Sequence, residues 1–550
     1  MHLVGIALFW LITCITHSFG FNALMISIGA AGHVTPMFEL AKAMKNHNVT
    51  FITEPHARSY LKLKTISNKS SLNLIYVNDS TEAFIEQKKA EQEAMEYFLD
   101  HSLVDNLFYL VESMPPDVNA LMNTTVNLLL TQQYDVTIAN SLVLGINSLC
   151  FDTNIPCVIH MANSMANIFD TDIPSGYSLL TPKQIRNFGY RIYSTAFTIR
   201  LLASIARGLI KSINTISRAL PRISGPYYES FAVKNILREK HNLLKLYSVP
   251  PTLFPLSYPD SYSKYIGGFI NDLSMDMIED DLTRWIKSKR DSSILYAAFG
   301  SIGIIRPNRM KSLLEGLAIF LLQTSDASIL LAFLNANHDT YVRVLNEISN
   351  NDHRRILSNT DRVRVENGFI PQKWILEQSA VGLFISHCGM GSLVEGLYFE
   401  KPILCLPLHT DQFVNAIAVD QSKIGKSLFV PPSPFESFLN PHDFHDYKFS
   451  TDSVIMAVSS MWMNSTYKQA ARIMSLEMRH AGGLKRAAEE IELFVNLKGD
   501  LDRCTPFHSK LPFYQRYMLD VGIVYFVLPI ISLFYILRQC CHRSREQKVD

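Results

Sequence analysis

The sequence predicts an α/β protein with two doubly wound parallel-sheet domains that face each other across a cleft, followed by a C-terminal transmembrane helix. Short apolar strands alternate with helical patterns in two separate stretches, which is typical of parallel sheets with helical crossovers. A segment rich in Pro, Ser and Tyr at 247–269 separates the two stretches. An uncharged apolar run follows at 521–537.

Length and composition agree with this organisation. A chain of 550 residues is too long for one ordinary core, so two or three domains are expected. The hydrophobic fraction of 48% and the charged fraction of 18% are those of a globular protein with additional apolar segments. The net charge of +1 offers no basic excess to neutralise phosphates, so nucleic acid is not expected as a partner.

Both ends of the chain carry targeting signals. The apolar run at 3–20 ends in small residues and predicts a signal peptide over 1–20, with an uncleaved anchor as the alternative. With the two apolar residues at 518 and 519, the C-terminal run predicts a membrane span over 518–537. The basic tail at 538–550 is then cytosolic. The domains are expected in the lumen of the endoplasmic reticulum or of another secretory compartment.

Glycosylation sequons support a luminal position, and they lie at Asn48, Asn68, Asn78, Asn123 and Asn464. Eight cysteines in so long a chain do not indicate a disulfide scaffold. One lies in the signal peptide, and Cys540 and Cys541 beside the span are candidates for palmitoylation by position. Any disulfide among the other five would be incidental to the fold; these are Cys150, Cys157, Cys388, Cys405 and Cys504.

The first domain is expected at 21–250, with a helix from about Pro36 and with strands within 22–29, 49–53, 134–140 and 155–161. The second, at 251–510, repeats the pattern with strands within 292–301, 327–334, 363–369, 381–387, 402–408 and 426–430. Ligands of such sheets bind at the carboxyl ends of the strands, so the cleft between the domains is the expected site.

The segment 189–216 stands apart because it has a helical period and carries Arg191, Arg200, Arg207 and Lys211. One interpretation places it on the luminal membrane surface. The alternative is a pair of core helices or one wall of an acceptor pocket.

The stretch 384–416 contains the most informative chemistry. His387, Cys388, Cys405 and His409 are four metal-ligand types, but zinc favours ligand pairs two to four residues apart. The first pair is adjacent, so its side chains diverge, and Cys405 lies within an apolar strand. We therefore expect no metal site.

A phosphate site fits the same stretch better. A strand ends at His387, a loop of small residues follows, and a helix begins near Ser392, which offers free N–H groups to an anion. Glu395 is placed to bind a ribose diol. Asp411 and Gln412 stand at the next strand-to-helix turn, where they suit sugar hydroxyls. The alternative for each of them, and above all for Asp411, is helix capping.

The segments GFIPQKWIL and FISHCGMGSLVEGLYFEKPILCLPLHTDQFVNA resemble the donor-binding signature of the UDP-glycosyltransferases. The resemblance covers nearly the whole chain, from the signal peptide to the single span with its basic tail. It implies a GT-B fold of two Rossmann-like domains, the first binding the acceptor and the second the UDP-sugar. It also implies inverting, metal-independent transfer to a small lipophilic acceptor, with the UDP-sugar as co-substrate and no cofactor.

The resemblance implies roles for the uridine-binding residues. Phe369 stands where the family usually has Trp and would stack on uracil, and Gln372 would pair with the uracil edge. Glu395 would bind ribose, and Asp411 with Gln412 would bind the donor sugar.

The resemblance implies phosphate contacts as well. Ser301 and Ser392 would contact the diphosphate, and His387 would hold a phosphate oxygen and stabilise the leaving UDP. Gly391 stands where the family often has Asn, so one donor contact is expected to be lost or replaced by backbone.

His33, expected between the first strand and a helix, occupies the place of the family's catalytic base. Imidazole suits this role because its unperturbed pKa is near neutral. A loop histidine that caps a helix is the alternative. A redox dinucleotide site is not expected, because the glycine fingerprint is broken to Gly29 and Gly32 although Glu54 follows the next strand.

The family's His is oriented by an Asp, but the matching residue is Asn140. Asp135 would lie roughly 16 Å away, at the other end of the strand. Asn140 can fix a tautomer of His33 but cannot balance an imidazolium charge. Either the enzyme is slow, another carboxylate serves, or the acceptor ionises easily.

UDP-glucose is the preferred donor and UDP-glucuronate the next, since no extra cation stands out around 406–413. The competing hypothesis is a catalytically impaired UDP-sugar-binding relative that acts as a regulatory partner. A homo- or hetero-oligomer stays open, and the acceptor cannot be named from the sequence.

Overall fold

The computed structural model describes residues 20–61, 72–101, 116–143, 146–153, 155–161, 179–197, 199, 203, 243–254, 261–271, 279–301, 303–334, 336–431, 446, 448–505, 507, 511 and 513–546. The expected signal peptide up to residue 19, the sequon at Asn68 and most of segment 189–216 lie outside these residues.

A seven-stranded sheet forms the first domain, in the order β3-β2-β1-β4-β5-β6-β7. All of its strand pairs are parallel. Strands β2 and β3 follow on one side of β1, and β4 to β7 follow on its other side. This order confirms the doubly wound sheet. The strands are β1 (Asn22–Ile26), β2 (Asn48–Thr53), β3 (Leu72–Tyr76), β4 (Val136–Asn140), β5 (Cys157–Met161), β6 (Leu243–Tyr247) and β7 (Ser263–Tyr265).

A six-stranded sheet forms the second domain, in the order β10-β9-β8-β11-β12-β13, and its strand pairs are parallel too. Its four inner strands are mostly apolar and buried, as expected for a sheet covered on both faces, whereas the two edge strands are more polar and less buried. They are β8 (Ile294–Ala298), β9 (Ser328–Phe333), β10 (Val363–Asn367), β11 (Val381–Ser386), β12 (Ile403–Cys405) and β13 (Gly425–Ser427).

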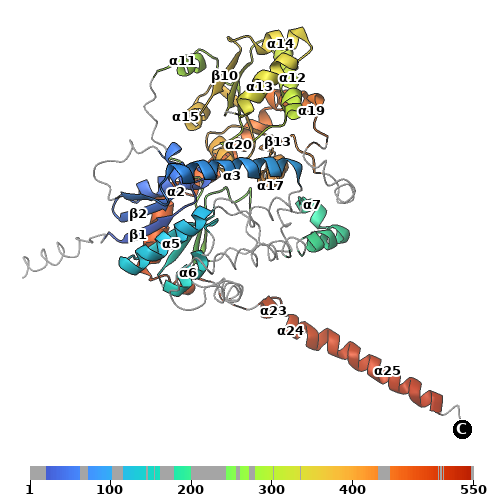
Figure 1. The fold of residues 1–550 in the computed structure, drawn as a ribbon. Helices are drawn as coiled ribbons and strands as arrows, with labels where there is room; N and C mark the ends of the chain where they lie inside the picture. Colours follow the sequence, from blue (N-terminus) through green and yellow to red (C-terminus); the bar gives the residue numbers. More distant parts are fainter. Residues whose placement is uncertain are drawn as a thin grey trace, which may run out of the picture.

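Helices cover the sheets and connect their strands (Figure 1). Those of the first domain are α2 (Ala31–Ala43), η1 (Pro55–Ser59), α3 (Thr81–Asp100), α5 (Pro116–Thr131), α6 (Ile146–Thr153) and α7 (Pro182–Ile185). Those of the second are α11 (Asp281–Lys287), α12 (Pro307–Gln323), α13 (Ala336–Glu347), α14 (Asn351–Leu357), α15 (Gln372–Glu377), α16 (Met390–Tyr398), α17 (Gln412–Gln421), α19 (Thr451–Met463) and α20 (Ser465–His480).

The chain returns to the first domain after α20. Helix α21 (Gly483–Asn496) packs beside α2 on the first sheet, because its apolar residues Ala487, Ile491 and Phe494 recur on one helical face. They share a buried cluster with Met37 of α2 and Ile138 of β4. The short helix η6 (Asp502–Cys504) follows.

The first sheet also continues past residue 250, where the sequence predicted the domain boundary. Strand β7, within the segment 247–269 that the sequence predicted to separate the two domains, pairs with β6. The expected second domain of 251–510 therefore begins too early and ends too late. Strand β7 has only three residues and stands among Pro and Ser, so the composition of the segment concealed it.

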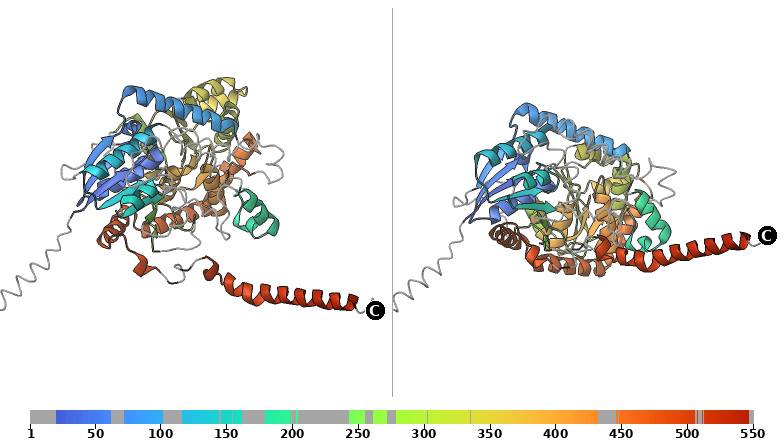
Figure 2. Two further views of the ribbon diagram at one scale, coloured as in Figure 1. Left: turned by 60° about the horizontal axis from the view of Figure 1, so that its bottom comes forward. Right: turned by 90° about the horizontal axis from the view of Figure 1, so that it is seen from below.

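The C-terminal segment leaves the body of the molecule (Figures 1 and 2). It consists of α23 (Phe513–Arg516), α24 (Leu519–Gly522), η7 (Ile523–Val527) and α25 (Leu528–Glu546). Within it, the 21 residues Leu519–Gln539 form a helical stretch long and apolar enough to cross a membrane, with no part buried against the protein. This agrees with the predicted span at 518–537.

Candidate active site

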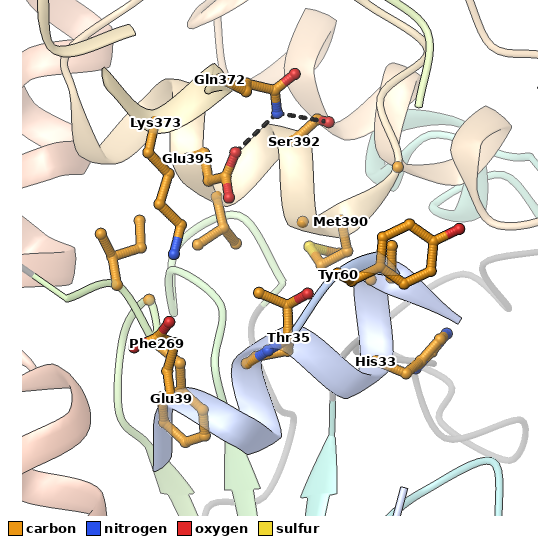
Figure 3. A pocket seen from close by; sticks show the side chains of 18 of the residues that line it. His33, Thr35, Glu39, Tyr60, Phe269, Gln372, Lys373, Met390, Ser392 and Glu395 are labelled. Atoms are coloured by element: carbon orange, nitrogen blue, oxygen red, sulfur yellow. Dashed lines mark hydrogen bonds between the residues drawn. The ribbon is translucent and has the colours of Figure 1, made fainter. Parts of the chain in front are cut away.

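A large cleft of about 2310 Å³ lies between the two domains. It opens where the carboxyl ends of β1 and β8 face each other, as the fold class predicts. His33 from the first domain lines it. So do the nine residues expected to bind the donor, namely Ser301, Phe369, Gln372, His387, Gly391, Ser392, Glu395, Asp411 and Gln412. Figure 3 shows His33 on one side of this space and Gln372, Ser392 and Glu395 on the other.

His33 lies in the first turn of α2, whereas the sequence predicted it before a helix that starts near Pro36. The helix begins five residues earlier because the Val34 amide already bonds to the Ala30 carbonyl at 2.9 Å. Burial lowers the pKa of His33 to about 4, and the polar side chain of Asn140 opposes part of this decrease. The ring is therefore neutral at physiological pH and carries one nitrogen lone pair.

Asn140 ends β4, is fully buried and does not line the cleft itself. Its Oδ1 accepts a hydrogen bond from the Leu142 amide at 3.0 Å. Asp135 cannot replace it, because the Asp135 carboxylate binds the Asn22 amide at 2.7 Å at the opposite end of the strands. Glu54 is also engaged elsewhere, since it accepts a hydrogen bond from the Gly29 amide at 2.6 Å.

Two glycines enclose the His387 ring. A β-carbon on Gly300 would lie 2.7 Å from His387 Nε2, and one on Gly389 would lie 2.5 Å from the same atom. Gly300 also has a φ of +75°, which favours glycine. Burial lowers the pKa of His387 to about 4, opposed by a hydrogen bond with the Ala298 backbone. A neutral imidazole is thus held beside the Ser301 turn and the start of α16.

The side chain of Gln372 is hydrogen-bonded to both Ser392 and Glu395 (Figure 3). Nε2 of Gln372 donates to Oε2 of Glu395 at 2.7 Å and lies 3.1 Å from Oγ of Ser392. Burial raises the pKa of Glu395, Lys373 and Gln372 oppose the increase, and Glu39 of the first domain adds to it. The three side chains thus form one polar wall of the cleft. A ligand with hydroxyl and amide groups can replace the hydrogen bonds within this wall.

Asp411 ends the turn between β12 and α17, and Gln412 is the first residue of α17. Asp411 makes no capping bond to α17, which excludes the capping interpretation for its side chain. Its carboxylate instead accepts hydrogen bonds from Thr410 and Asn415, both at 3.1 Å. The amide of Gln412 braces the turn, because its Oε1 accepts from the backbone amides of Leu408 and His409 at 2.9 and 3.1 Å.

Phe369 and Gly391 stand where the two domains approach each other. The Phe369 side chain is 65% exposed, and its ring centroid lies 5.5 Å from that of Tyr60 in the first domain. A β-carbon on Gly391 would meet nothing closer than Cα of Gly32, at 3.9 Å. Phe369 therefore keeps a ring face available, and Gly391 contributes backbone alone.

Cys388, in the loop after β11, forms a disulfide, whereas the sequence predicted only that any disulfide would be incidental to the fold. Cys388, next to His387, is bonded to Cys405 of β12, and a second disulfide joins Cys150 and Cys157. Cys388 and Cys405 are therefore not available as thiolate ligands. The disulfide between them fixes the loop that carries His387 to the neighbouring strand.

Sequence reasoning missed Lys373, Glu39 and Tyr60, all of which line the cleft. Lys373 directly follows Gln372, and no motif in the sequence singles it out. Glu39 lies on the face of α2 that Thr35 and Lys42 share, at spacings of four and three residues. Helical periodicity from the first turn of α2 is the signal that would have found Glu39.

Solved structures with this architecture are glycosyltransferases of the GT-B class. A glycotransferase of kitacinnamycin aligns with a TM-score of 0.58 and 15% identity, over 86% of this chain and 99% of that one. A UDP-glucosyltransferase from Polygonum tinctorium aligns with a TM-score of 0.54 and 15% identity, over 88% and 100%. At these identities the likeness establishes the fold alone.

The family model for UDP-glucoronosyl and UDP-glucosyl transferases matches residues 41–549, and the chain belongs to this family. Abscisate beta-glucosyltransferase of Phaseolus angularis is 31% identical over 140 residues, 25% of this chain and 28% of that protein. Anthocyanidin 3-O-glucosyltransferase of Solanum melongena is 26% identical over 155 residues, 28% and 32%. The chain thus spans about a third or less of the curated relatives it matches.

Replacing Gly389 by Ala should weaken UDP binding by about tenfold or more, because the new methyl group must displace the His387 ring. The backbone of Gly389 has a φ of −61°, which alanine adopts freely, so the effect isolates the steric contact. Isothermal titration with UDP measures it. Gly391→Ala is the matched control, since its methyl group meets only Cα of Gly32, at an ordinary contact distance of 3.9 Å. Equal affinities for the two variants would contradict the His387 cradle.

Proposed function

We propose that the protein transfers a sugar from a UDP-sugar to a hydroxyl of a small lipophilic acceptor by inverting, metal-independent displacement, with His33 as general base. The observation that carries the proposal is one cleft lined by His33 on one side and by all nine expected donor residues on the other. Family membership supports a UDP-sugar as the donor.

In the proposed step, Nε2 of His33 takes the proton of the acceptor hydroxyl as that oxygen bonds to the anomeric carbon. The bond from this carbon to the β-phosphate oxygen breaks, and UDP leaves with the electron pair. The free amides at the start of α16 donate hydrogen bonds to the departing diphosphate. His387, which already donates one N–H to the Ala298 backbone, donates from its second nitrogen once the negative charge of the diphosphate raises its pKa and the ring takes up a proton. Attack from the side of His33, opposite the phosphate cradle, inverts the anomeric centre.

UDP-glucose remains the preferred donor. The Asp411 carboxylate contacts the neutral side chains of Thr410 and Asn415. Burial raises the pKa of Asp411, opposed by hydrogen bonds from Thr410 and Asn415, so this part of the cleft favours neutral hydroxyls over a second carboxylate. UDP-glucuronate is the second candidate.

The neutral Asn140 favours acceptors that ionise easily. A carboxylate would stabilise the imidazolium that forms on His33, whereas an amide cannot. Phenols and carboxylic acids need less help from the base than alcohols do. One relative is named for abscisate, and one structural neighbour is described as glucosylating indoxyl. Both names are compatible with acidic acceptor groups for this chain.

The same Asn140 supports a second candidate, a catalytically impaired relative that binds UDP-sugars and acts as a regulatory partner. Turnover decides between the two. The wild-type protein should convert UDP-glucose and a panel of phenols to glycosides that product mass identifies. His33→Ala should lower turnover by at least about 100-fold, the usual contribution of a general base, while retaining UDP affinity. If both proteins bind UDP and neither makes a glycoside, the regulatory candidate stands and the enzymatic one fails.

The acid limb of kcat/KM should lie well below pH 6.5, because His33 with a pKa of about 4 stays neutral and basic down to that range. Asn140→Asp should raise the pKa of His33, move this limb to higher pH and raise kcat by at least about tenfold. His33 also stabilises the fold less as pH falls from 6.5 toward 4, so unfolding must be followed in parallel. A wild-type limb at or above pH 6.5, or no change in Asn140→Asp, would contradict this account.

We further propose that the two domains lie in the lumen of the endoplasmic reticulum or of another secretory compartment, anchored by the helix at Leu519–Gln539. Two disulfides support an oxidising compartment. Exposed sequons at Asn48, Asn78 and Asn464 support it as well, whereas Asn123 is half-buried.

The part of segment 189–216 that the structure describes supports contact with the membrane surface. Ile192 and Ile199 are exposed, as is Phe188 just before the segment, so these residues do not form a core helix. Arg191 lies over the Phe188 ring at 5.9 Å from its centroid. Figures 1 and 2 place this segment, which follows α7, at the edge of the molecule.

Glycan and protease mapping on microsomes tests this topology. The protein should lose mass with endoglycosidase H, and protease added outside should remove only a tag placed after residue 550. Deleting 518–550 should release the domains into the soluble luminal fraction. An unglycosylated protein whose domains are digested from outside would contradict the luminal position.

A further inference from the structure

The register of the first sheet brings Asn140 and His160 side by side. They are Cα partners on the neighbouring parallel strands β4 and β5, so their side chains point to the same face. Ile138 and Val158, two residues earlier on these strands, belong to the buried cluster that α2 covers. Asn140 and His160 therefore face α2, the helix that carries His33.

His160 is fully buried and held on two sides. Its Nε2 lies 2.9 Å from Oγ of Ser248, and its ring stacks on Phe269 with centroids 5.0 Å apart and planes 18° from parallel. Burial lowers the pKa of His160 to about 3, and the nearby His33 lowers it further. The imidazole is thus neutral, with one nitrogen that donates and one that accepts.

Three buried nitrogens in this region have no partner at full hydrogen-bond geometry: Nδ1 of His33, Nδ2 of Asn140 and Nδ1 of His160. Buried polar groups are nearly always hydrogen-bonded, so three such atoms on adjacent residues need an explanation. Side-chain contacts of a catalytic site are often loose before substrate binds and tighten in the complex.

We propose that His160 is a positioning residue, which acts through Asn140 to hold His33 in the tautomer that can serve as base. The inference rests on the proposed function of His33. Nδ1–H of His33 donates to Oδ1 of Asn140, Nδ2–H of Asn140 donates to Nδ1 of His160, and Nε2–H of His160 donates to Oγ of Ser248. Each of the three nitrogens then has one partner.

The direction of these hydrogen bonds matters because the side-chain amide of Asn140 can be turned around. The Leu142 amide already donates to Oδ1 of Asn140 and so restrains the amide, and the acceptor nitrogen of His160 secures its other end. With this orientation the lone pair of His33 Nε2 faces the cleft. With the amide reversed, Nδ2 would face His33 and force the proton onto Nε2, which removes the base. Neutral His160 thereby fixes a tautomer without the negative charge of an aspartate.

Kinetics of three variants test the chain of hydrogen bonds. His160→Phe should keep the stack on Phe269 but lower kcat about tenfold or more, which is less than the ~10⁴ lost when a serine-protease triad has the wrong tautomer. Its KM for UDP-glucose should stay within about twofold because the donor wall is untouched. His160→Gln retains an acceptor for Asn140 and should fall in between. When Asn140→Asp is also present, so that a carboxylate orients His33 directly, His160→Phe should cost less than about threefold.

Two outcomes would overturn the proposal. One is a His160→Phe variant with wild-type kcat. The other is an equal loss from His160→Phe with and without the Asn140→Asp substitution, because that indicates a structural role alone. If His160→Phe fails to bind UDP and is misfolded, Ser248→Ala takes its place. It should lower kcat about threefold by itself and have no effect when Asn140→Asp is also present, and no loss in either case would overturn the proposal.

A measurement without turnover separates this inference from the proposed function. Diethyl pyrocarbonate acylates the unprotonated nitrogen of a histidine, so its rate at His33, followed by peptide mass spectrometry, reports the lone pair of Nε2. The rate should fall at least about threefold in His160→Phe at pH 7, where the imidazole is neutral in both proteins. Equal rates would overturn the chain of hydrogen bonds. If no acceptor is glycosylated by the wild type, the proposed function fails, and the labelling result still decides the role of His160.

Discussion

The site depends on the close approach of two helix starts, that of α2 in the first domain and that of α16 in the second. Only backbone separates them at Gly32 and Gly391, where a β-carbon on the latter would lie 3.9 Å from the former. This approach brings His33 opposite the His387 loop. The return of α21 to pack beside α2 and the disulfide from Cys388 to β12 hold each side of the junction in place.

Neutral imidazoles set the chemistry of this junction. Burial lowers the pKa values of His33 and His387 to about 4 and that of His160 to about 3. Each of these rings is charged more readily in the unfolded chain, so its contribution to stability is complete above pH 6.5 and is lost as pH falls toward the folded pKa. In the proposed reaction, position 140 offers His33 an amide in place of a carboxylate, so geometry alone helps His33 to remove the proton, which favours acidic acceptors.

The sequence predicted two doubly wound sheets and the cleft between them because these depend on local patterns, although β3 and β6 were not among the predicted strands. His387, Ser392 and Glu395 stand at fixed spacings after one strand, and all three line the cleft with Gln372, which is hydrogen-bonded to the latter two. The sequence did not predict that Asn140 and His160 lie side by side, because the register between strands β4 and β5 cannot be deduced from the spacing of residues along the chain. The disulfide of Cys388 and Cys405 and the return of α21 are also contacts between distant segments, and β7 was too short to give a period.

The central claim is that acceptor and donor meet in one cleft, with the base and the phosphate cradle on opposite sides of the anomeric carbon. The anomeric configuration of the product tests this most directly. Proton NMR of the glycoside formed from UDP-α-glucose and a phenol should show the β anomer, produced by a single inverting displacement. An α-glycoside would contradict the account, because it requires attack from the side of the departing UDP or a covalent intermediate on the enzyme.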